Sequence, residues 1–149
     1  MKPIESNESL PSRRASMNNL ATTIDGLRAV LLNFPEIRVA FLFGSMARNQ
    51  AGFASDLDLG VAAGQLLDID RRMAITTALA QAVRRPIDLI DLGEAGVRVL
   101  RSVFRGIPVV MHDRMLYGRL IVRMLSLAAD FEPYRRRILD VRRHAWIGT

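Results

Sequence analysis

Phe43-Gly44-Ser45-Met46-Ala47-Arg48 is the most informative stretch of this sequence, together with Asp56-Leu57-Asp58-Leu59 a short distance later. Ten residues separate Ser45 from Asp56. The first motif follows a β-branched and aromatic run that predicts a strand. A strand that ends in Gly-Ser leaves backbone amides pointing out of a tight turn, where they can bind an anion. On the next strand, two carboxylates at i and i+2 share one face while the intervening leucines enter the core.

The two motifs together predict a site for a nucleoside triphosphate that carries Mg²⁺. Oxygen-rich carboxylate sites favour hard cations, and the coordination of Mg²⁺ is usually completed by substrate phosphates. Asp88 supplies a third carboxylate inside an otherwise apolar strand, where an unpaired charge is costly and a metal would remove that cost. Three carboxylates around one or two Mg²⁺ ions can stabilise the attacking and the leaving oxygen in displacement at phosphorus.

The rest of the chain alternates between helical and extended patterns. Strands are expected at residues 37–43, 58–62, 87–90 and 109–111. Helices are expected at 18–32, from the N-cap Asp68 to 83, from an Asp91/Glu94 capping box to 103, from 116 onward, and again from Pro133. This order predicts an α+β fold with a small mixed β-sheet flanked by helices. We expect a flexible N-terminal arm over residues 1–19 and one domain with a helical C-terminal tail over 20–149.

Composition limits the class of protein. The chain has 149 residues, no cysteine and two histidines, so thiolate sites are excluded and a zinc site is not indicated. The first residues lack the apolar run of a signal peptide, and no segment has the roughly 18 apolar residues of a membrane span, so a cytoplasmic protein is expected. The net charge of +6 comes almost wholly from arginine, and it allows direct nucleic-acid binding without requiring it.

These motifs resemble those of a known family. Gly44-Ser45, the gap, Asp56-Leu57-Asp58 and the later Asp88 resemble the nucleotidyltransferase superfamily related to DNA polymerase β. The short length and the Gly-Ser-Met-Ala-Arg form resemble its minimal nucleotidyltransferase branch, the MntA-type antitoxins. The specific motifs cover residues 43–92, and a looser pattern that includes Gly106, Tyr117 and the helical tail covers most of the remainder. The resemblance implies the polymerase β-like nucleotidyltransferase fold.

The resemblance also implies roles for single residues. Gly44 and Ser45 match the turn that holds the triphosphate, and Arg48 matches an arginine that either contacts phosphate or braces the loop. Asp56, Asp58 and Asp88 match the family's metal ligands and catalytic residues, and Asp88 is also the candidate general base. The family commonly has Gly after the arginine, whereas this chain has Asn49, a residue that tolerates left-handed backbone.

Each of these residues has a simpler structural interpretation. Gly44-Ser45 alone could be a strand-to-helix turn with Ser45 as the cap. The Asp56/Asp58 pair could be solvated at a strand edge, and Asp88 could pair with Arg84 or Arg85. Asp91 is interpreted as a helix cap, because alternation turns it away from Asp88.

The resemblance implies an enzyme that uses Mg²⁺ and moves AMP from ATP to a hydroxyl, with release of pyrophosphate. The implied acceptor is a tyrosine of a partner HEPN-family ribonuclease toxin, which makes the chain an antitoxin. One alternative is transfer to a small molecule of the aminoglycoside type. Another is a non-catalytic module that senses nucleotide and neutralises a toxin by occlusion. Five arginines of the tail, between Arg135 and Arg143, form either a docking face for the partner or a solvated surface.

Overall fold

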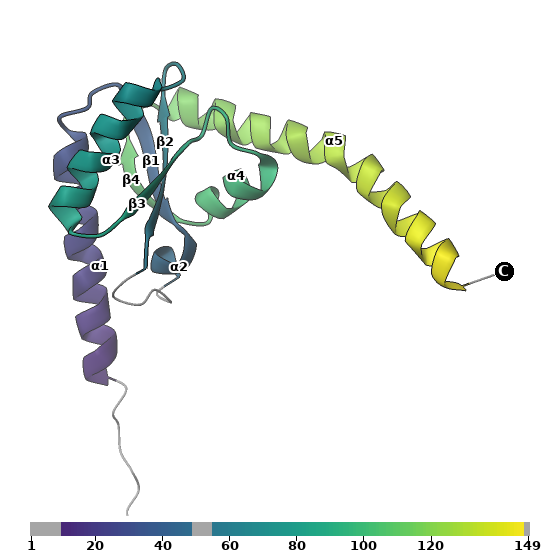
Figure 1. Ribbon diagram of the computed structural model, residues 1–149, viewed down its shortest axis with the longest axis horizontal. Helices are drawn as coiled ribbons and strands as arrows, with labels where there is room; N and C mark the ends of the chain where they lie inside the picture. Colours follow the sequence, from purple (N-terminus) through teal and green to yellow (C-terminus); the bar gives the residue numbers. More distant parts are fainter. Residues whose placement is uncertain (1–9, 49–54, 148–149) are drawn as a thin grey trace, which may run out of the picture.

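The computed structural model describes residues 10–48 and 55–147, which form a four-stranded sheet with helices on both faces (Figure 1). The elements in chain order are α1 (Leu10–Leu31), β1 (Ile37–Phe43), α2 (Gly44–Ala47), β2 (Leu57–Ala63), α3 (Ile69–Val83), β3 (Ile87–Asp91), α4 (Val97–Phe104), β4 (Ile107–Met111) and α5 (Arg114–Ile147). The strand order is β3-β2-β1-β4. β1 is antiparallel to β2 and β4, whereas β2 and β3 are parallel. The predicted mixed sheet is confirmed.

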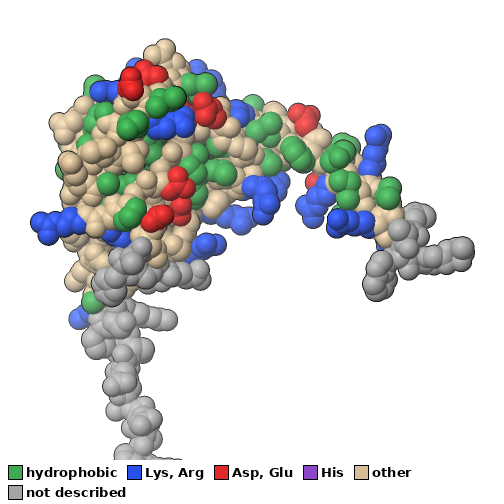
Figure 2. Space-filling model, in the orientation of Figure 1, with side chains coloured by type: hydrophobic (Ala, Val, Ile, Leu, Met, Phe, Trp, Pro, Cys, Tyr) green, Lys and Arg blue, Asp and Glu red, His purple; other side chains and the backbone are tan. Residues whose placement is uncertain are grey.

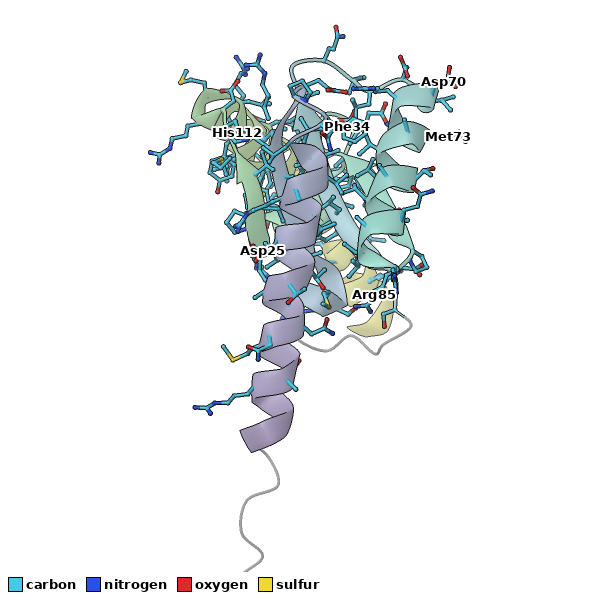
Figure 3. The ribbon with its side chains drawn as sticks, turned by 90° about the vertical axis from the view of Figure 1, so that its left-hand side faces the viewer. Asp25, Phe34, Asp70, Met73, Arg85 and His112 are labelled. Carbon is cyan, nitrogen blue, oxygen red and sulfur yellow. The ribbon has the colours of Figure 1, made fainter. Side chains whose placement is uncertain are left out.

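One core lies between the sheet and the helices α1 and α3, which Figure 3 shows side by side over this face. Leu57, Leu59 and Val61 alternate along β2 and all enter this core. Alternation then sends the side chains at 58, 60 and 62 to the opposite face. The apolar spacing of β2 therefore determines where the carboxylate of Asp58 points.

The second core lies between the other face of the sheet and the helices α4 and α5. Phe41 stacks on Tyr117 of α5 with ring centroids 5.7 Å apart, and Phe104 of α4 contacts both rings edge-on. Because β1 lies between two strands and two helical layers, six of its seven residues are buried. The end of β1 that leads into Gly44 is therefore buried.

Three helix boundaries differ from those expected. α1 begins at Leu10 rather than Asn18, so residues 10–19 of the expected arm are helical, with Pro11 in a first turn that tolerates it. The capping-box prediction is wrong, because Asp91 ends β3 and α4 begins later, with Gly96 as its N-cap. Pro133 does not begin a helix but lies inside α5, which bends along its C-terminal half (Figure 1).

Other predicted boundaries are confirmed. The carboxylate of Asp68 accepts a hydrogen bond from the Arg71 backbone N–H at 2.7 Å, as expected of the N-cap of α3. α4 ends at Phe104, two residues before Gly106. Within the part of the chain that the structure describes, none of the helices combines the length and apolar character that a membrane span requires.

Candidate active site

The turn after β1 depends on glycine. Gly44 has a φ of +71°, a left-handed conformation that L side chains rarely adopt. A Cβ atom on Gly44 would also lie 2.0 Å from Oδ2 of Asp58, far inside van der Waals contact. The absence of a side chain at residue 44 therefore lets the Asp58 carboxylate lie directly against the turn. The glycine turn and the carboxylate motif therefore lie next to each other in the structure, as predicted.

The strand register aligns the candidate site residues across the sheet. Asp58 pairs with Phe43 of β1 on one side and with Asp88 of β3 on the other. Residues in register on neighbouring strands point to the same face, so both carboxylates project to the side of α4 and α5. Asp56 lies one residue before β2, and it shares this face with Asp58 by alternation.

The charges of these carboxylates act on one another. Partial burial raises the pKa of the Asp58 carboxyl, the negative charges of Asp88 and Asp56 raise it further, and Arg48 lowers it. Asp56 and Asp88 are exposed, and Asp58 is half-buried. The fold thus gathers negative charge at one end of the sheet and compensates it only in part.

This donor set fits a hard cation that brings other ligands with it. Within residues 10–48 and 55–147, no three Asp, Glu, His or Cys side chains are close enough to hold a metal ion by themselves. Mg²⁺ is commonly bound by one or two carboxylates, with waters and substrate phosphates completing the octahedron. The Asp58 carboxyl, whose pKa is raised by partial burial and by its negative neighbours, is chemically suited to that arrangement.

The remaining predicted residues lie beside the turn. Ser45 is the second residue of α2, whose N-cap is Phe43, so Ser45 is not the cap. The backbone N–H of Arg48 closes the short helix by donating to the carbonyl of Gly44 at 3.3 Å. Its guanidinium is exposed and acts on the charge of Asp58. Asn49 lies outside the described residues.

Arg85 also supports this end of the sheet. The simpler structural interpretation of the sequence pairs it with Asp88 instead. Its Nη2 donates to the carbonyl of Ser55 at 2.9 Å, and its Nη1 contacts Sδ of Met46 at 3.5 Å. Figure 3 shows Arg85 at the end of the molecule where α2 lies. These contacts tie α2 to the residue that precedes Asp56, and they do not support a pair between Arg85 and Asp88. Arg84 is the exposed, left-handed C-cap of α3.

Asp91 has a structural role at the opposite end of β3. It is only 4 % exposed, and its two oxygens accept backbone N–H bonds from Leu67 and Gly93, each at 2.9 Å. Nη2 of Arg72 lies 4.0 Å from Oδ2. The sequence carries a signal for this role, because Asp91-Leu92-Gly93 fits an Asx turn, in which the carboxylate accepts from the backbone two residues later.

Known proteins resemble this chain in sequence and in fold. The chain is 27 % identical, over 114 residues, to the protein adenylyltransferase MntA of Shewanella oneidensis, and the match covers 72 % of this chain and 78 % of that protein. A chain in a crystal structure of a toxin–antitoxin with AMP-PNP superposes with a TM-score of 0.68 at 24 % identity, covering 78 % of this chain and 95 % of that one.

A second solved structure holds a tri-AMPylated Shewanella oneidensis HEPN toxin in complex with an MNT antitoxin. One of its chains superposes with a TM-score of 0.59 at 25 % identity, covering 84 % of this chain and 96 % of that one. The family model described as "Polymerase beta, Nucleotidyltransferase" matches residues 26–115. Since that match spans more than half of the sequence, this chain belongs to the polymerase β nucleotidyltransferase family.

Proposed function

We propose that this protein transfers AMP from ATP to a tyrosine hydroxyl of a HEPN-family toxin, and that it acts as the antitoxin of that pair. The observation that carries the proposal is the pairing of Asp58 with Asp88 in register, with Asp58 against the glycine turn. Arg48 compensates their mutual repulsion only in part. A bound cation would relieve this repulsion, and a polyphosphate would complete the coordination of that cation. The likeness to MntA supports AMP as the transferred group.

The turn and the carboxylates would divide the binding of MgATP between them. Gly44 and Ser45 would present backbone N–H groups to the triphosphate, since glycine allows phosphate to approach the main chain closely. Asp56, Asp58 and Asp88 would hold Mg²⁺, which supplies charge neutralisation on the phosphates when it is bound. The charge of Arg48 offsets part of the negative charge at Asp58.

Asp88 would activate the acceptor. It is exposed at the end of the carboxylate row, where an incoming hydroxyl can reach it. In this step Asp88 accepts the hydroxyl proton, the hydroxyl oxygen forms a bond to the α-phosphorus, and the bond from that phosphorus to the bridging oxygen breaks. Pyrophosphate leaves with that oxygen and its electron pair, and the acceptor retains AMP.

A labelling experiment tests the proposal. The protein is incubated with labelled ATP, MgCl₂ and a purified HEPN-family toxin, and the label is located by mass spectrometry. We expect AMP on a toxin tyrosine with the wild type, none with Asp88→Asn, and near-normal labelling with the control Asp70→Asn. Asp70 is exposed in the first turn of α3, at the far end of the sheet from α2 (Figure 3). Asp88→Asn should still bind MgATP. Toxin neutralised without any label would refute transfer and favour occlusion.

A further inference from the structure

α5 carries an apolar stripe with heptad spacing that continues well beyond the domain. Its members follow one another at alternating steps of four and three residues, the repeat that places side chains along one seam of a coiled coil. They are Leu120, Met124, Leu127, Phe131, Tyr134, Ile138 and Val141. We call these residues the α5 seam.

The two halves of the α5 seam have opposite environments. Leu120 is buried, and Met124 and Leu127 pack against the core between the sheet and α4. The four later members are exposed: Phe131 by 61 %, Tyr134 by 63 %, Ile138 by 40 % and Val141 by 70 %. Figure 1 shows this half of α5 projecting from the domain, and Figure 2 shows hydrophobic and basic side chains together along it. One seam is therefore covered by this chain at one end and open at the other.

The residues that flank the exposed half are mainly basic. In the heptad, positions e and g border the seam, and here they hold Arg135, Arg137 and Arg142, with Asp130 as the acidic exception. All four are exposed. Flanking charges select the partner helix of a coiled coil, because unlike charges across the interface attract and like charges repel.

We propose that the exposed half of the α5 seam docks an amphipathic helix of the partner protein, one whose own apolar stripe is flanked by Asp and Glu. The inference deepens the proposed function and rests on it for the identity of that partner as the acceptor. A second copy of this chain is the less suitable occupant, because pairing α5 with itself sets arginine against arginine. Docking here would hold the acceptor protein to the domain through a surface separate from the carboxylates.

A groove marks where the partner helix would meet the domain. It measures 510 Å³ and lies between α4 and α5 at the point where the covered part of the seam ends. Phe131 and Ala128 line it from α5, and Val97 and Val99 line it from α4. Arg98, Arg101 and Arg135 border it, with Glu132 as the one acidic lining residue, so the charge around the groove is mainly basic. An apolar side chain of the docked helix can enter between the two helices while its acidic neighbours meet these arginines.

The first test separates the seam from the rest of α5. Ile138→Glu with Val141→Glu places two charges on the seam beyond the groove, away from the packed core. The control, Ser126→Glu with Ala129→Glu, adds the same charge to exposed outer positions of the same helix. Binding to the purified HEPN protein is measured by calorimetry. We expect the seam variant to lose at least tenfold in affinity and the control to match the wild type, with equal helical circular dichroism and equal MgATP affinity.

The second test concerns the flanking charge. Arg135→Glu with Arg142→Glu reverses two e positions, and Arg136→Glu with Arg143→Glu reverses two outer positions with the same change in net charge. The probe is a synthetic four-heptad helix with Leu and Ile on its stripe and Glu at its flanks, compared with the same helix flanked by Lys. We expect the wild type to prefer the Glu peptide and only the e-position variant to lose that preference, most clearly at low salt.

The outcomes separate this inference from the proposed function. Equal loss in the e-position and outer-position variants would indicate general attraction to acidic molecules, such as nucleic acid, and would overturn the docking site. A wild-type dimer that Ile138→Glu with Val141→Glu dissociates would assign the seam to a second copy instead. Labelled toxin with unchanged affinity in the seam variant would refute the docking site and leave the transfer reaction standing. Docking through the seam without labelling would refute the reaction alone.

Discussion

Asp88 and Asp91 lie three residues apart on β3, yet they belong to regions of the molecule with opposite electrostatics. Asp91 is buried, and the protein supplies its partners: two backbone N–H groups and the nearby Arg72. Asp88 is exposed beside Asp58, and partial burial together with the charge of Asp88 raises the pKa of the Asp58 carboxyl. A carboxylate whose partners come from its own chain stabilises the fold. A carboxylate that repels its neighbours is available to a ligand.

The largest difference between the two regions should appear in Asp56→Asn and Asp58→Asn, which we expect to lose nucleotidyl transfer without losing stability. Each substitution removes the charge of a proposed metal ligand with little change in volume, so we expect turnover to fall at least about a thousandfold, equivalent to ~4 kcal/mol of transition-state stabilisation. The free energy of unfolding should not fall. The measurement is pyrophosphate release at saturating ATP, alongside urea unfolding. Near-normal turnover in either variant would remove that residue from the metal site.

Asp91→Ala should show the reverse pattern. It leaves the buried N–H groups of Leu67 and Gly93 without an acceptor and Arg72 without its buried counter-charge, so we expect a loss of ~3 kcal/mol in the free energy of unfolding. Asp68→Ala serves as the control, because it removes an exposed N-cap worth only ~1 kcal/mol. Urea unfolding of the two variants compares them directly. An Asp91→Ala protein as stable as Asp68→Ala would show that the buried bonds contribute little.

The sequence predicted the region of Asp88 better than that of Asp91. The family, the mixed sheet and the transferase activity predicted from the motifs are confirmed by the family match and the relatives. The roles of Gly44, Ser45, Arg48, Asp56, Asp58 and Asp88 remain predictions. A short stretch of sequence is enough to predict which carboxylates share a face of the sheet, because side chains along a strand alternate with a period of two.

The errors lie where distant segments decide the structure. The pair Asp91 and Glu94 predicts a helix cap, but the Asp91 carboxylate accepts a hydrogen bond from the backbone N–H of Leu67, 24 residues away in sequence. Pro133 predicts a helix start, yet an exposed helix can continue through proline with a bend when only one hydrogen bond is lost. Neither the burial of Asp91 nor the continuation of α5 is encoded in a short local pattern.

Gly44→Ala tests the contact between the turn and the carboxylates. The left-handed φ costs an L residue ~1–2 kcal/mol, and the new Cβ would displace the Asp58 carboxylate. We therefore expect lower stability by that amount and a loss of MgATP binding. The same substitution at Gly118, in α5 with open space around it, should instead stabilise by up to ~1 kcal/mol. Thermal unfolding and nucleotide titration of the pair would reveal whether the effect is specific to the turn.

The smallest expected effect is a gain in stability when the charge of Asp58 is removed. The folded state raises the pKa of this carboxyl above its unfolded value of ~3.9, so folding favours the protonated form. Below the unfolded pKa the Asp58 carboxyl is protonated in both the folded and the unfolded state, and the wild type loses no stability. As pH rises through the folded pKa, the wild type loses stability that Asp58→Asn retains.

Asp58→Asn should therefore unfold like the wild type near pH 3 and be more stable at pH 7 by less than ~1 kcal/mol, since the group is only half-buried and solvent screens it. Urea unfolding at the two pH values, without divalent cation, measures the difference. Adding MgCl₂ at pH 7 should stabilise the wild type but not the variant, because the cation relieves the repulsion between Asp58 and its neighbouring carboxylates. The difference in stability between the two proteins should then become smaller. A variant that is less stable than the wild type at pH 7 would show that the Asp58 carboxylate supports the fold, as Asp91 does, and would remove the contrast between the two regions.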